Sequence, residues 1–216
     1  MTTARIVILP TGTANTASVM AGLERVGARP RLAVRPQDLV SADGVVVPGV
    51  GSFKVARLQL EEGGFWEPLR RRVAERRPTL AICLGLQLLA ESSMEDPGGR
   101  GLGLIPTQVN RFPAHVRVPH MGWNTVTANP GCRLITDGEA YFANSYRLGG
   151  ESPLPATQGQ DWHLALTDHG GNFIAACESG PVLACQFHPE LSGEYGSLLL
   201  RRWTALATET QGEDSC

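Results

Sequence analysis

The sequence has no hydrophobic run long enough to cross a membrane. None of its runs approaches the ~20 apolar residues that a membrane helix needs. The first ten residues, MTTARIVILP, hold an apolar run of only four, far shorter than the core of a secretory signal peptide. These absences argue against a membrane or exported protein and predict a cytoplasmic location.

An excess of charge of either sign is also missing. The chain has 19 Lys and Arg against 21 Asp and Glu, a net charge of −2, and Lys54 is its only lysine. This balance gives no reason to expect a nucleic-acid-binding surface. Internal repeats are absent too, so 216 residues with 42% hydrophobic content fit one globular domain with a full-sized core.

The cysteines lack the spacing of a zinc site or a disulfide framework. Their number is odd, and no CxxC pair or Cys/His cluster occurs. The five are Cys83, Cys132, Cys177, Cys185 and Cys216. Thiols kept reduced in a cytoplasm fit this pattern best. We expect no metal and no bound cofactor.

Apolar strand patterns alternate with helical patterns in the first 93 residues. Strands are expected at 5–9, 31–34, 43–49 and 79–83, and helices after Asn15, at 66–77 and at 85–92. This alternation predicts an α/β fold whose mostly parallel central sheet is covered by helices on both faces.

The second half of the chain changes character. Short strand-like runs separated by Gly, Pro and Asn turns are expected at 107–112, 115–119, 124–128, 140–148, 163–167, 172–178 and 182–187. They predict antiparallel additions to the sheet, and 194–203 reads as a closing helix. We expect a single domain over residues 1–205 and a polar C-terminal tail over residues 206–216.

Cys83 lies between an apolar strand pattern and an apolar helix pattern in TLAICLGLQLLAE. A free cysteine is often only a small buried hydrophobe. At a strand-to-helix turn, however, it can be a nucleophile that receives the positive end of the helix dipole, and the small Gly85 allows a tight turn. Cys83 also ends its strand, where parallel sheets bind ligands.

A thiolate at neutral pH needs a base nearby, because a free thiol has a pKa of about 8.5. The segment CQFHPE is an apolar strand that stops at His188, with Glu190 two residues later. On an extended chain these two side chains face the same way, so Glu190 can orient the imidazole. Alone, His188 reads better as a satisfied histidine at a strand end, but together with Cys83 it completes a nucleophile–base–carboxylate set.

A glycine-rich turn follows another strand in VVVPGVGSF (45–53). Gly49 and Gly51 flank Val50 and permit unusual backbone angles, so backbone N–H groups can approach a ligand. Acyl transfer needs such donors for the oxyanion of its tetrahedral intermediate. An ordinary turn between a strand and a helix remains the plain alternative.

Three of these motifs, AICLGLQLL, PGVGSF and QFHPE, resemble in this order the class I (triad) glutamine amidotransferases. The resemblance runs from Gly12 to about Trp203. The segments VPHMGWN (118–124) and YFANSY (141–146) are similar to those of one branch, the glutaminase subunits of imidazole glycerol phosphate synthases.

The resemblance implies a role for each matching residue. The catalytic residues would be Cys83 as nucleophile, His188 as general base and acid, and Glu190 as its orienter. The oxyanion donors would be the N–H of Leu84 and one from the Val50–Gly51 peptide. The residues implied to hold the substrate are Gly49, Gln87, Asn144, Ser145 and Tyr146. The residues implied to face the partner are Pro119, His120, Met121, Gly122, Trp123 and Asn124.

The implied reaction is hydrolysis of L-glutamine to glutamate and ammonia. The ammonia would pass to a (β/α)8-barrel cyclase partner, which forms imidazole glycerol phosphate and aminoimidazole carboxamide ribotide in histidine biosynthesis. The resemblance implies a heterodimer and no cofactor.

The chain departs from the family pattern at four places. The 9–15 turn lacks the usual acidic-tyrosine-glycine sequence, Ala81 replaces a glycine, Asn144 replaces a histidine and Leu191 replaces a lysine. Three alternatives stay open: a divergent glutaminase that feeds another synthase, a stand-alone γ-glutamyl thiol hydrolase, and a catalytically dead partner. The intact Cys83, His188 and Glu190 disfavour the last.

Overall fold

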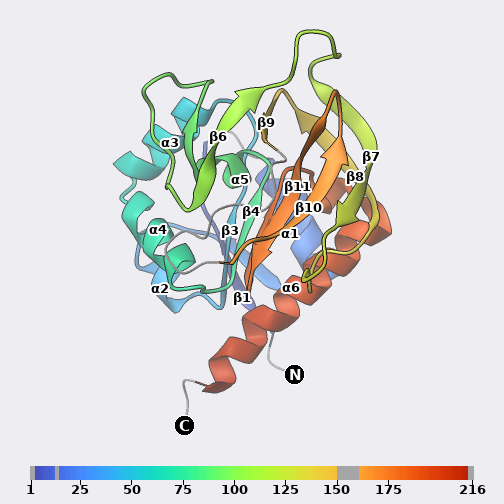
Figure 1. The fold of residues 1–216 in the computed structure, drawn as a ribbon. Coiled ribbons are helices and arrows are strands. Elements are labelled where there is room, and N and C mark those ends of the chain that lie inside the picture. Colours follow the sequence, from blue (N-terminus) through green and yellow to red (C-terminus); the bar gives the residue numbers. More distant parts are fainter. Residues whose placement is uncertain (1–2, 13–14, 150–160, 214–216) are drawn as a thin grey trace.

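A central β-sheet organises the chain in the computed structural model, which describes residues 3–12, 15–149 and 161–213. Nine strands of the described chain form this sheet, in the order β2-β1-β3-β4-β12-β11-β10-β7-β8 (Figure 1). Their bounds are β1 (Arg5–Ile8), β2 (Arg29–Leu32), β3 (Gly44–Val47), β4 (Thr79–Ile82), β7 (His120–Ala128), β8 (Gly138–Asn144), β10 (His163–Asp168), β11 (Asn172–Ser179) and β12 (Val182–Cys185).

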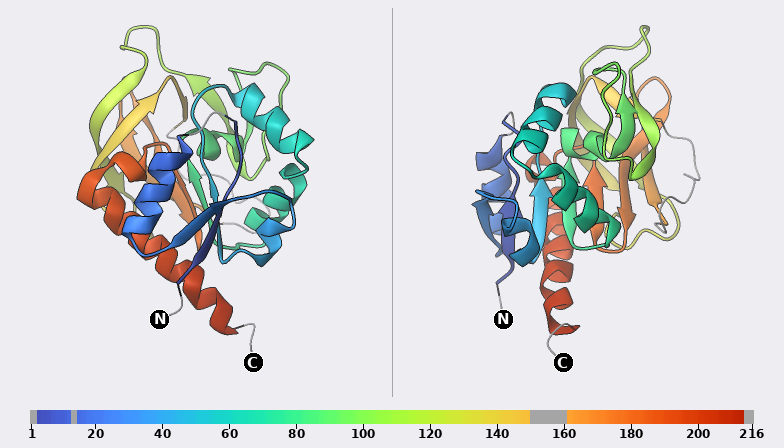
Figure 2. Two further views of the ribbon diagram at one scale, coloured as in Figure 1. Left: turned by 180° about the vertical axis from the view of Figure 1, so that it is seen from behind. Right: turned by 90° about the vertical axis from the view of Figure 1, so that its left-hand side faces the viewer.

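Helices cover both faces of the sheet. They are α1 (Thr16–Arg25), α2 (Asp38–Ser41), α3 (Phe53–Glu62), α4 (Trp66–Ala74), α5 (Leu84–Leu88) and α6 (Gly193–Glu213). Alternate strand residues face opposite ways: Ile6 and Ile8 pack in the cluster that includes α1 and α6, whereas Val7 packs in the cluster that includes α3 and α4. Figure 2 shows α1 and α6 side by side on one face.

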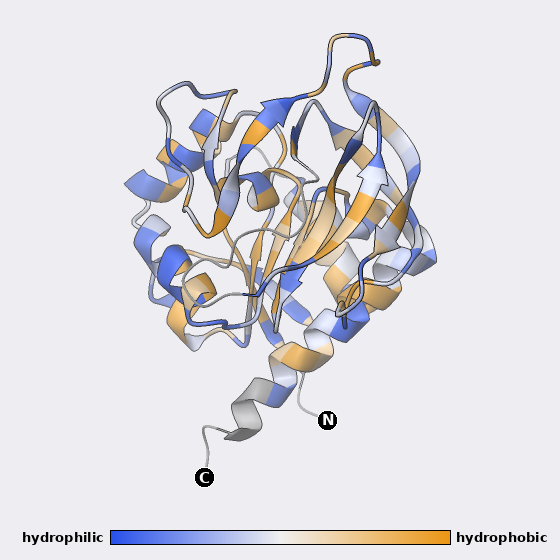
Figure 3. Cartoon of the chain, viewed as in Figure 1, coloured by the Kyte–Doolittle hydropathy of each residue, from blue (hydrophilic) through white to orange (hydrophobic). Residues whose placement is uncertain are grey.

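The two halves of the sheet differ in strand direction, as the sequence predicts. Strands β2, β1, β3, β4 and β12 are parallel neighbours, and β12, β11, β10, β7 and β8 pair antiparallel. The inner parallel strands β3, β4 and β12 are buried along their whole length and lie in the orange centre of Figure 3, whereas β2 at the edge of the sheet is polar and largely exposed. The expected α/β fold, with a parallel core and antiparallel additions to the sheet, is confirmed.

A second sheet of three strands in the described chain corrects one expectation. It contains β5 (Ala90–Ser93), β6 (Ile105–Arg111) and β9 (Tyr146–Leu148). The helix expected over 85–92 ends at Leu88 and becomes β5. The reason is tertiary, because the N–H groups of Leu102 and Leu104 bond the carbonyls of Leu88 and Leu89 and so replace the next helical turn.

Other expectations also need correction. The 115–119 run is a loop, and the expected strand at 140–148 divides at Ser145 into β8 and β9, which belong to different sheets. Helices α2 and α3 were not predicted. The tail expected from residue 206 begins inside α6, where Ala207 is fully buried against the core.

No helix in the described segments is both long and apolar enough to span a bilayer.

Candidate active site

Cys83 sits in a sharp turn between β4 and α5. Its backbone has φ 52° and ψ −101°, a conformation that non-glycine residues rarely adopt. Its N–H donates to the carbonyl of Cys185 on the neighbouring strand at 2.7 Å. A Cβ on Gly85 would lie 2.1 Å from the Val47 carbonyl oxygen, so only glycine lets α5 start this close to β3. The turn is therefore held in its strained form from both sides.

His188 follows β12, the strand that pairs in parallel with β4. The register places Cys185 beside Ile82, so Cys83 and His188 leave the sheet at the same edge. The His188 N–H donates to the Tyr141 carbonyl at 2.9 Å, which fixes its backbone. The structure thus brings together Cys83 and His188, which the sequence analysis expects to act together.

Glu190 bonds the imidazole by a different geometry from the expected one. Its Oε1 lies 2.9 Å from His188 Nδ1, and both side chains are buried. Pro189–Leu191 is a 3₁₀ turn (η1), not an extended chain. The Ser192 hydroxyl bonds the His188 carbonyl at 2.7 Å and closes this turn. The turn, and not strand alternation, brings the carboxylate back onto the ring.

The electrostatics of His188 favour its charged form. Burial disfavours the imidazolium, but hydrogen bonds and charge from Cys83 and Glu190 outweigh this and raise the pKa of His188 to about 10. An imidazolium between a thiolate and a carboxylate satisfies all three groups. A thiol, an imidazole and a carboxylate in this arrangement have the chemistry that nucleophilic catalysis by cysteine needs.

A pocket of about 290 Å³ opens over Cys83. Its lining includes most of the residues that the sequence implicates in substrate and oxyanion binding. These residues are Val50, Gly51, Leu84, Gln87, Asn144, Ser145 and Tyr146. Gly49 lies directly behind them, since a Cβ on it would be 2.6 Å from the Leu84 Cβ.

Hydrogen bonds hold one wall of this pocket. The carbonyl of Tyr146 accepts from Gln87 Nε2 and from Asn144 Nδ2, each at 3.0 Å. These bonds join α5 to the β8–β9 segment, where the strand divides at Ser145. Ser145 and Tyr146 therefore line the same pocket as Cys83.

One of the two N–H groups expected to bind the oxyanion, that of Leu84, already donates to the glycine-rich turn. The Leu84 N–H donates to the Gly49 carbonyl at 3.3 Å, so a carbonyl oxygen stands where an oxyanion would bind. Gly51 has φ 92°, in the left-handed region that favours glycine. In this conformation the backbone between Gly49 and Gly51 blocks the site that it is expected to complete.

Two polar residues of the site were not found from the sequence. Glu95 lines the pocket and accepts the Phe53 N–H at 3.1 Å. Burial raises its pKa in spite of this bond. Gln186 is fully buried and donates a hydrogen bond to the Cys83 sulfur. Glu95 stands in the acidic run ESSMED, which carries no distinguishing pattern, but Gln186 stands inside the QFHPE motif.

The segment expected to face a partner divides between surface and interior. Pro119, Met121 (66% exposed) and Trp123 (56% exposed) point outward, and Gly122 and Asn124 are half-buried. The expectation is wrong for the side chain of His120, which is buried. Its ring stacks on that of His169 with 4.3 Å between centroids, and burial lowers its pKa to about 4.

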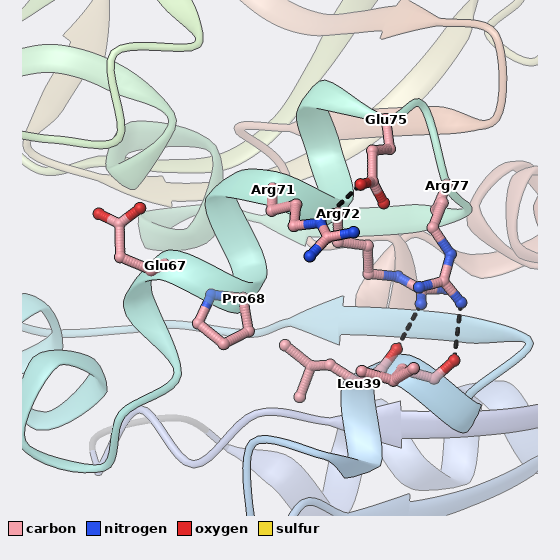
Figure 4. A pocket seen from close by; sticks show the side chains of 8 residues that line it. Leu39, Glu67, Pro68, Arg71, Arg72, Glu75 and Arg77 are labelled. Atoms are coloured by element: carbon pink, nitrogen blue, oxygen red, sulfur yellow. Dashed lines mark hydrogen bonds and ion pairs between the residues drawn. The ribbon is translucent and has the colours of Figure 1, made fainter.

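A larger pocket, of about 410 Å³, does not include Cys83 in its lining, which Figure 4 shows from close by. The guanidinium of Arg72 is buried there and donates to the carbonyls of Leu39, Ala42, Asp43 and Pro78. Pro78 precedes β4, whereas Cys83 follows it, so this pocket is at the opposite end of the strand. These bonds join the end of α2 to the residues that precede β3 and β4, which is a structural role.

Within the described segments, no group of three or more His, Cys, Asp or Glu residues is placed to hold a metal ion.

Comparison with known proteins shows to which family this chain belongs. The profile of glutamine amidotransferase class-I matches residues 15–204. A Renibacterium salmoninarum protein, imidazole glycerol phosphate synthase subunit HisH, is 42% identical over 207 residues, covering 93% of each chain. This chain belongs to the HisH family of class-I glutamine amidotransferases.

Relatives in the HisH family extend to archaea and plants. A Methanothermobacter thermautotrophicus HisH subunit is 39% identical over 93% of this chain and 98% of its own length. The chloroplastic imidazole glycerol phosphate synthase hisHF of Arabidopsis thaliana is 38% identical over 92% of this chain, but the match covers only 33% of that protein.

Solved structures agree with the amidotransferase fold. A crystal structure described as a glutamine amidotransferase has a TM-score of 0.72 at 22% identity and covers 94% of this chain and 98% of its own. A putative GMP synthase subunit from Thermoplasma acidophilum has a TM-score of 0.73 at 17% identity, with both chains covered completely.

Proposed function

We propose that this chain is the glutaminase subunit of an imidazole glycerol phosphate synthase. It hydrolyses L-glutamine to L-glutamate and ammonia, and the ammonia passes to a (β/α)8-barrel cyclase partner. The carrying observation is the Cys83–His188–Glu190 cluster beneath a pocket in a chain of the HisH family. The reaction belongs to histidine biosynthesis, and we place it in the cytoplasm.

The first half of the reaction forms a thioester. The Cys83 thiolate attacks the side-chain amide carbon of glutamine, and the carbonyl oxygen becomes an oxyanion. The intermediate collapses with cleavage of the C–N bond. His188, protonated and held by Glu190, gives its proton to the leaving nitrogen, so that ammonia departs. The product is a γ-glutamyl thioester on Cys83.

Water completes the second half. His188, now neutral, takes a proton from a water molecule that attacks the thioester carbon. Cleavage of the C–S bond then releases glutamate and regenerates the Cys83 thiolate beside the imidazolium. Ammonia leaves for the partner, whose cyclisation reaction consumes it.

The experiment that tests this function is a reconstitution with a cyclase subunit. The mixture should form imidazole glycerol phosphate from glutamine and the cyclase's phosphoribulosyl substrate. Glutamine-dependent product formation that is absent with the cyclase alone supports the assignment. Product formation with ammonia but never with glutamine contradicts it.

Glu95 is expected to bind the α-ammonium group of glutamine, because it places a carboxylate in the pocket lining. Glu95→Gln, which keeps an acceptor for the Phe53 N–H, should raise KM for glutamine about tenfold with little change in kcat. Steady-state kinetics in the complex measure this.

The control for this prediction is an analogue that lacks the α-amino group, 4-carbamoylbutanoate. Its KM should be the same in Glu95→Gln and in the unaltered protein. Glu91→Gln, an exposed carboxylate on β5, should change neither value. Equal KM values for glutamine in Glu95→Gln and the unaltered complex would remove this role.

Glu190→Gln should lower kcat less than His188→Ala, because an orienter does not carry the proton. The expected losses are about 10⁶ for His188→Ala and about 10⁴ or less for Glu190→Gln. Loss of the carboxylate also removes one cause of the raised His188 pKa. The alkaline fall of kcat in Glu190→Gln should therefore move to lower pH.

Measurement of kcat against pH in the complex checks this prediction. Glu194→Gln, at an exposed carboxylate nearby, is the matched control and should leave the profile unchanged. Equal or reversed losses in the two triad variants would show that Glu190 has another role.

The partner surface is proposed around β7 and the turn after His188. Met121, Trp123 and Leu191 (45% exposed) are large apolar residues in contact with solvent. A Cβ on Gly193 would lie 3.7 Å from the Trp123 ring, which places β7 next to that turn. A cyclase bound here would lie beside His188 and could receive ammonia directly.

A further inference from the structure

We infer that Gln186 is a further catalytic residue, whose side-chain amide holds the Cys83 sulfur and ties it to the wall of the glutamine pocket. The inference rests on the proposed glutaminase reaction. It assigns a role to a residue that lies two positions before the base and outside the triad.

The nitrogen and the oxygen of the Gln186 side-chain amide each form a hydrogen bond with a residue of the site. Its Nε2 donates to Cys83 Sγ at 3.4 Å. Its Oε1 accepts from Gln87 Nε2 at 3.1 Å. A hydrogen-bonded chain therefore runs from the sulfur through Gln186 and Gln87 to the Tyr146 carbonyl, which is part of the pocket wall.

Burial of the Gln186 side chain costs free energy, which argues that this amide has a function in the site. The side chain is fully buried next to Phe187, in a stretch that is otherwise apolar. A buried amide costs free energy unless both of its ends are bonded, and an apolar residue of the same size would avoid that cost. Its backbone N–H already bonds the Ala175 carbonyl at 2.7 Å, so the side chain is not needed to pair the strand.

The donor end acts on the nucleophile. An N–H directed at sulfur stabilises the thiolate over the thiol, since a charged acceptor forms the stronger hydrogen bond. It also gives the sulfur a second hydrogen-bond partner besides the imidazole of His188. When His188 gives up its proton to the leaving ammonia, Gln186 still supports the thiolate that the second half of the reaction releases.

The acceptor end acts through Gln87. It holds one N–H of the Gln87 amide while the Tyr146 carbonyl holds the other. The Gln87 side chain is thereby fixed relative to the sulfur. A substrate bound against Gln87 is then aligned with the attacking atom, which is the geometric requirement for rapid attack.

Two variants separate the two ends of the amide. Gln186→Met keeps the length but removes both hydrogen bonds. Gln186→Glu keeps an acceptor for Gln87 but places a carboxylate oxygen near the sulfur. Gln108→Met, on the exposed side of β6, is the matched control. Thermal unfolding of each full-length protein establishes that it is folded.

The decisive readout is the rate of Cys83 alkylation by iodoacetamide between pH 5 and 10, with the modified cysteine identified by peptide mass spectrometry. In Gln186→Met the profile should move to higher pH, and the rate at pH 7 should fall about tenfold. Gln186→Glu should show a larger shift, and Gln108→Met none. Profiles of folded Gln186→Met and Gln186→Glu that overlay that of the unaltered protein overturn the inference.

Steady-state kinetics in the cyclase complex test the acceptor end of the Gln186 amide, which bonds Gln87. Gln186→Met should lower kcat about tenfold to a hundredfold and raise KM for glutamine, whereas Gln186→Glu should lower kcat with KM nearly unchanged. Alkylation needs no substrate. Shifted alkylation profiles in a protein that never hydrolyses glutamine would therefore reject the proposed function and keep the Gln186–Cys83 contact.

Discussion

Cys83→Ala should abolish glutamine-dependent product formation while ammonia-dependent formation by the same complex continues. The variant lacks the sulfur that is proposed to form the thioester, and loss of a triad nucleophile costs about 10⁶ in kcat. Ammonia supplied in the medium bypasses this step, because the partner's chemistry does not use the thiol. The two activities of one sample therefore report separately on the two subunits.

The fold should survive this substitution. Cys83 is a small buried side chain, and alanine removes one atom from it without adding a polar group. The positive φ that strains Cys83 strains alanine to a similar degree. Far-UV circular dichroism and co-purification with the cyclase check that the loss is chemical.

Cys132→Ala is the matched control for the cysteine. Its thiol bonds the Leu164 carbonyl at 3.5 Å, and burial raises its pKa to about 11, so it is a poor nucleophile. Cys132→Ala should retain glutamine-dependent turnover. If Cys83→Ala retained it as well, the nucleophile would have to be a different residue.

The isolated chain should hydrolyse glutamine very slowly, and the complex with cyclase and its ligand should be activated by about 10²–10³. The physical reason is the Gly49 carbonyl, which accepts the Leu84 N–H and repels a developing oxyanion. Rotation of the Gly49–Val50 peptide removes this oxygen and can direct an N–H into the site. One oxyanion donor is worth about 10²–10³ in kcat.

Gly51→Ala should blunt this activation more than it weakens partner binding. Gly51 has φ 92°, and a Cβ there restricts the adjoining Val50–Gly51 peptide, which has to adjust when the Gly49–Val50 peptide rotates. Gly27→Ala is the matched control: Gly27 has φ 87°, no atom lies within 4 Å of its added Cβ, and it follows α1 at the other end of the sheet. It should leave activation unchanged.

Glutaminase rates of the chain alone, with cyclase, and with cyclase and ligand measure the effect directly. Full-speed hydrolysis without any partner would falsify both the blocked site and the synthase subunit. It would favour a stand-alone γ-glutamyl hydrolase. Normal activation in Gly51→Ala, with activation intact in Gly27→Ala, would place the switch elsewhere in the chain.

The local sequence was sufficient for the parts of the site that are contiguous in the chain. Cys83 at a strand-to-helix junction, the glycines around Val50 and the pair His188 and Glu190 are each visible within a few residues. The alternation of strands and helices placed these motifs at the carboxyl ends of neighbouring strands. Local patterns work here because buried parallel strands are apolar on both faces and sharp turns require glycine.

Local patterns were less successful where tertiary contacts set the backbone. The helix after Cys83 ends early because Leu102 and Leu104 compete for its last carbonyls. Glu190 reaches His188 through a 3₁₀ turn that Ser192 closes, and not through strand alternation. In both cases the hydrogen-bond partner comes from outside the motif whose conformation it determines.

The sequence by itself determined the family and the order of the motifs, and it singled out Cys83 and His188 as the expected nucleophile and base. Only the tertiary structure placed Glu95 in the pocket, turned His120 inward and directed the Gly49 carbonyl at Leu84. It also joined Gln186 to Cys83 across 103 residues and to Gln87 across 99. The physical reason is that a hydrogen bond depends on distance in space, and side chains so far apart in the chain approach one another only when the strands between them have paired.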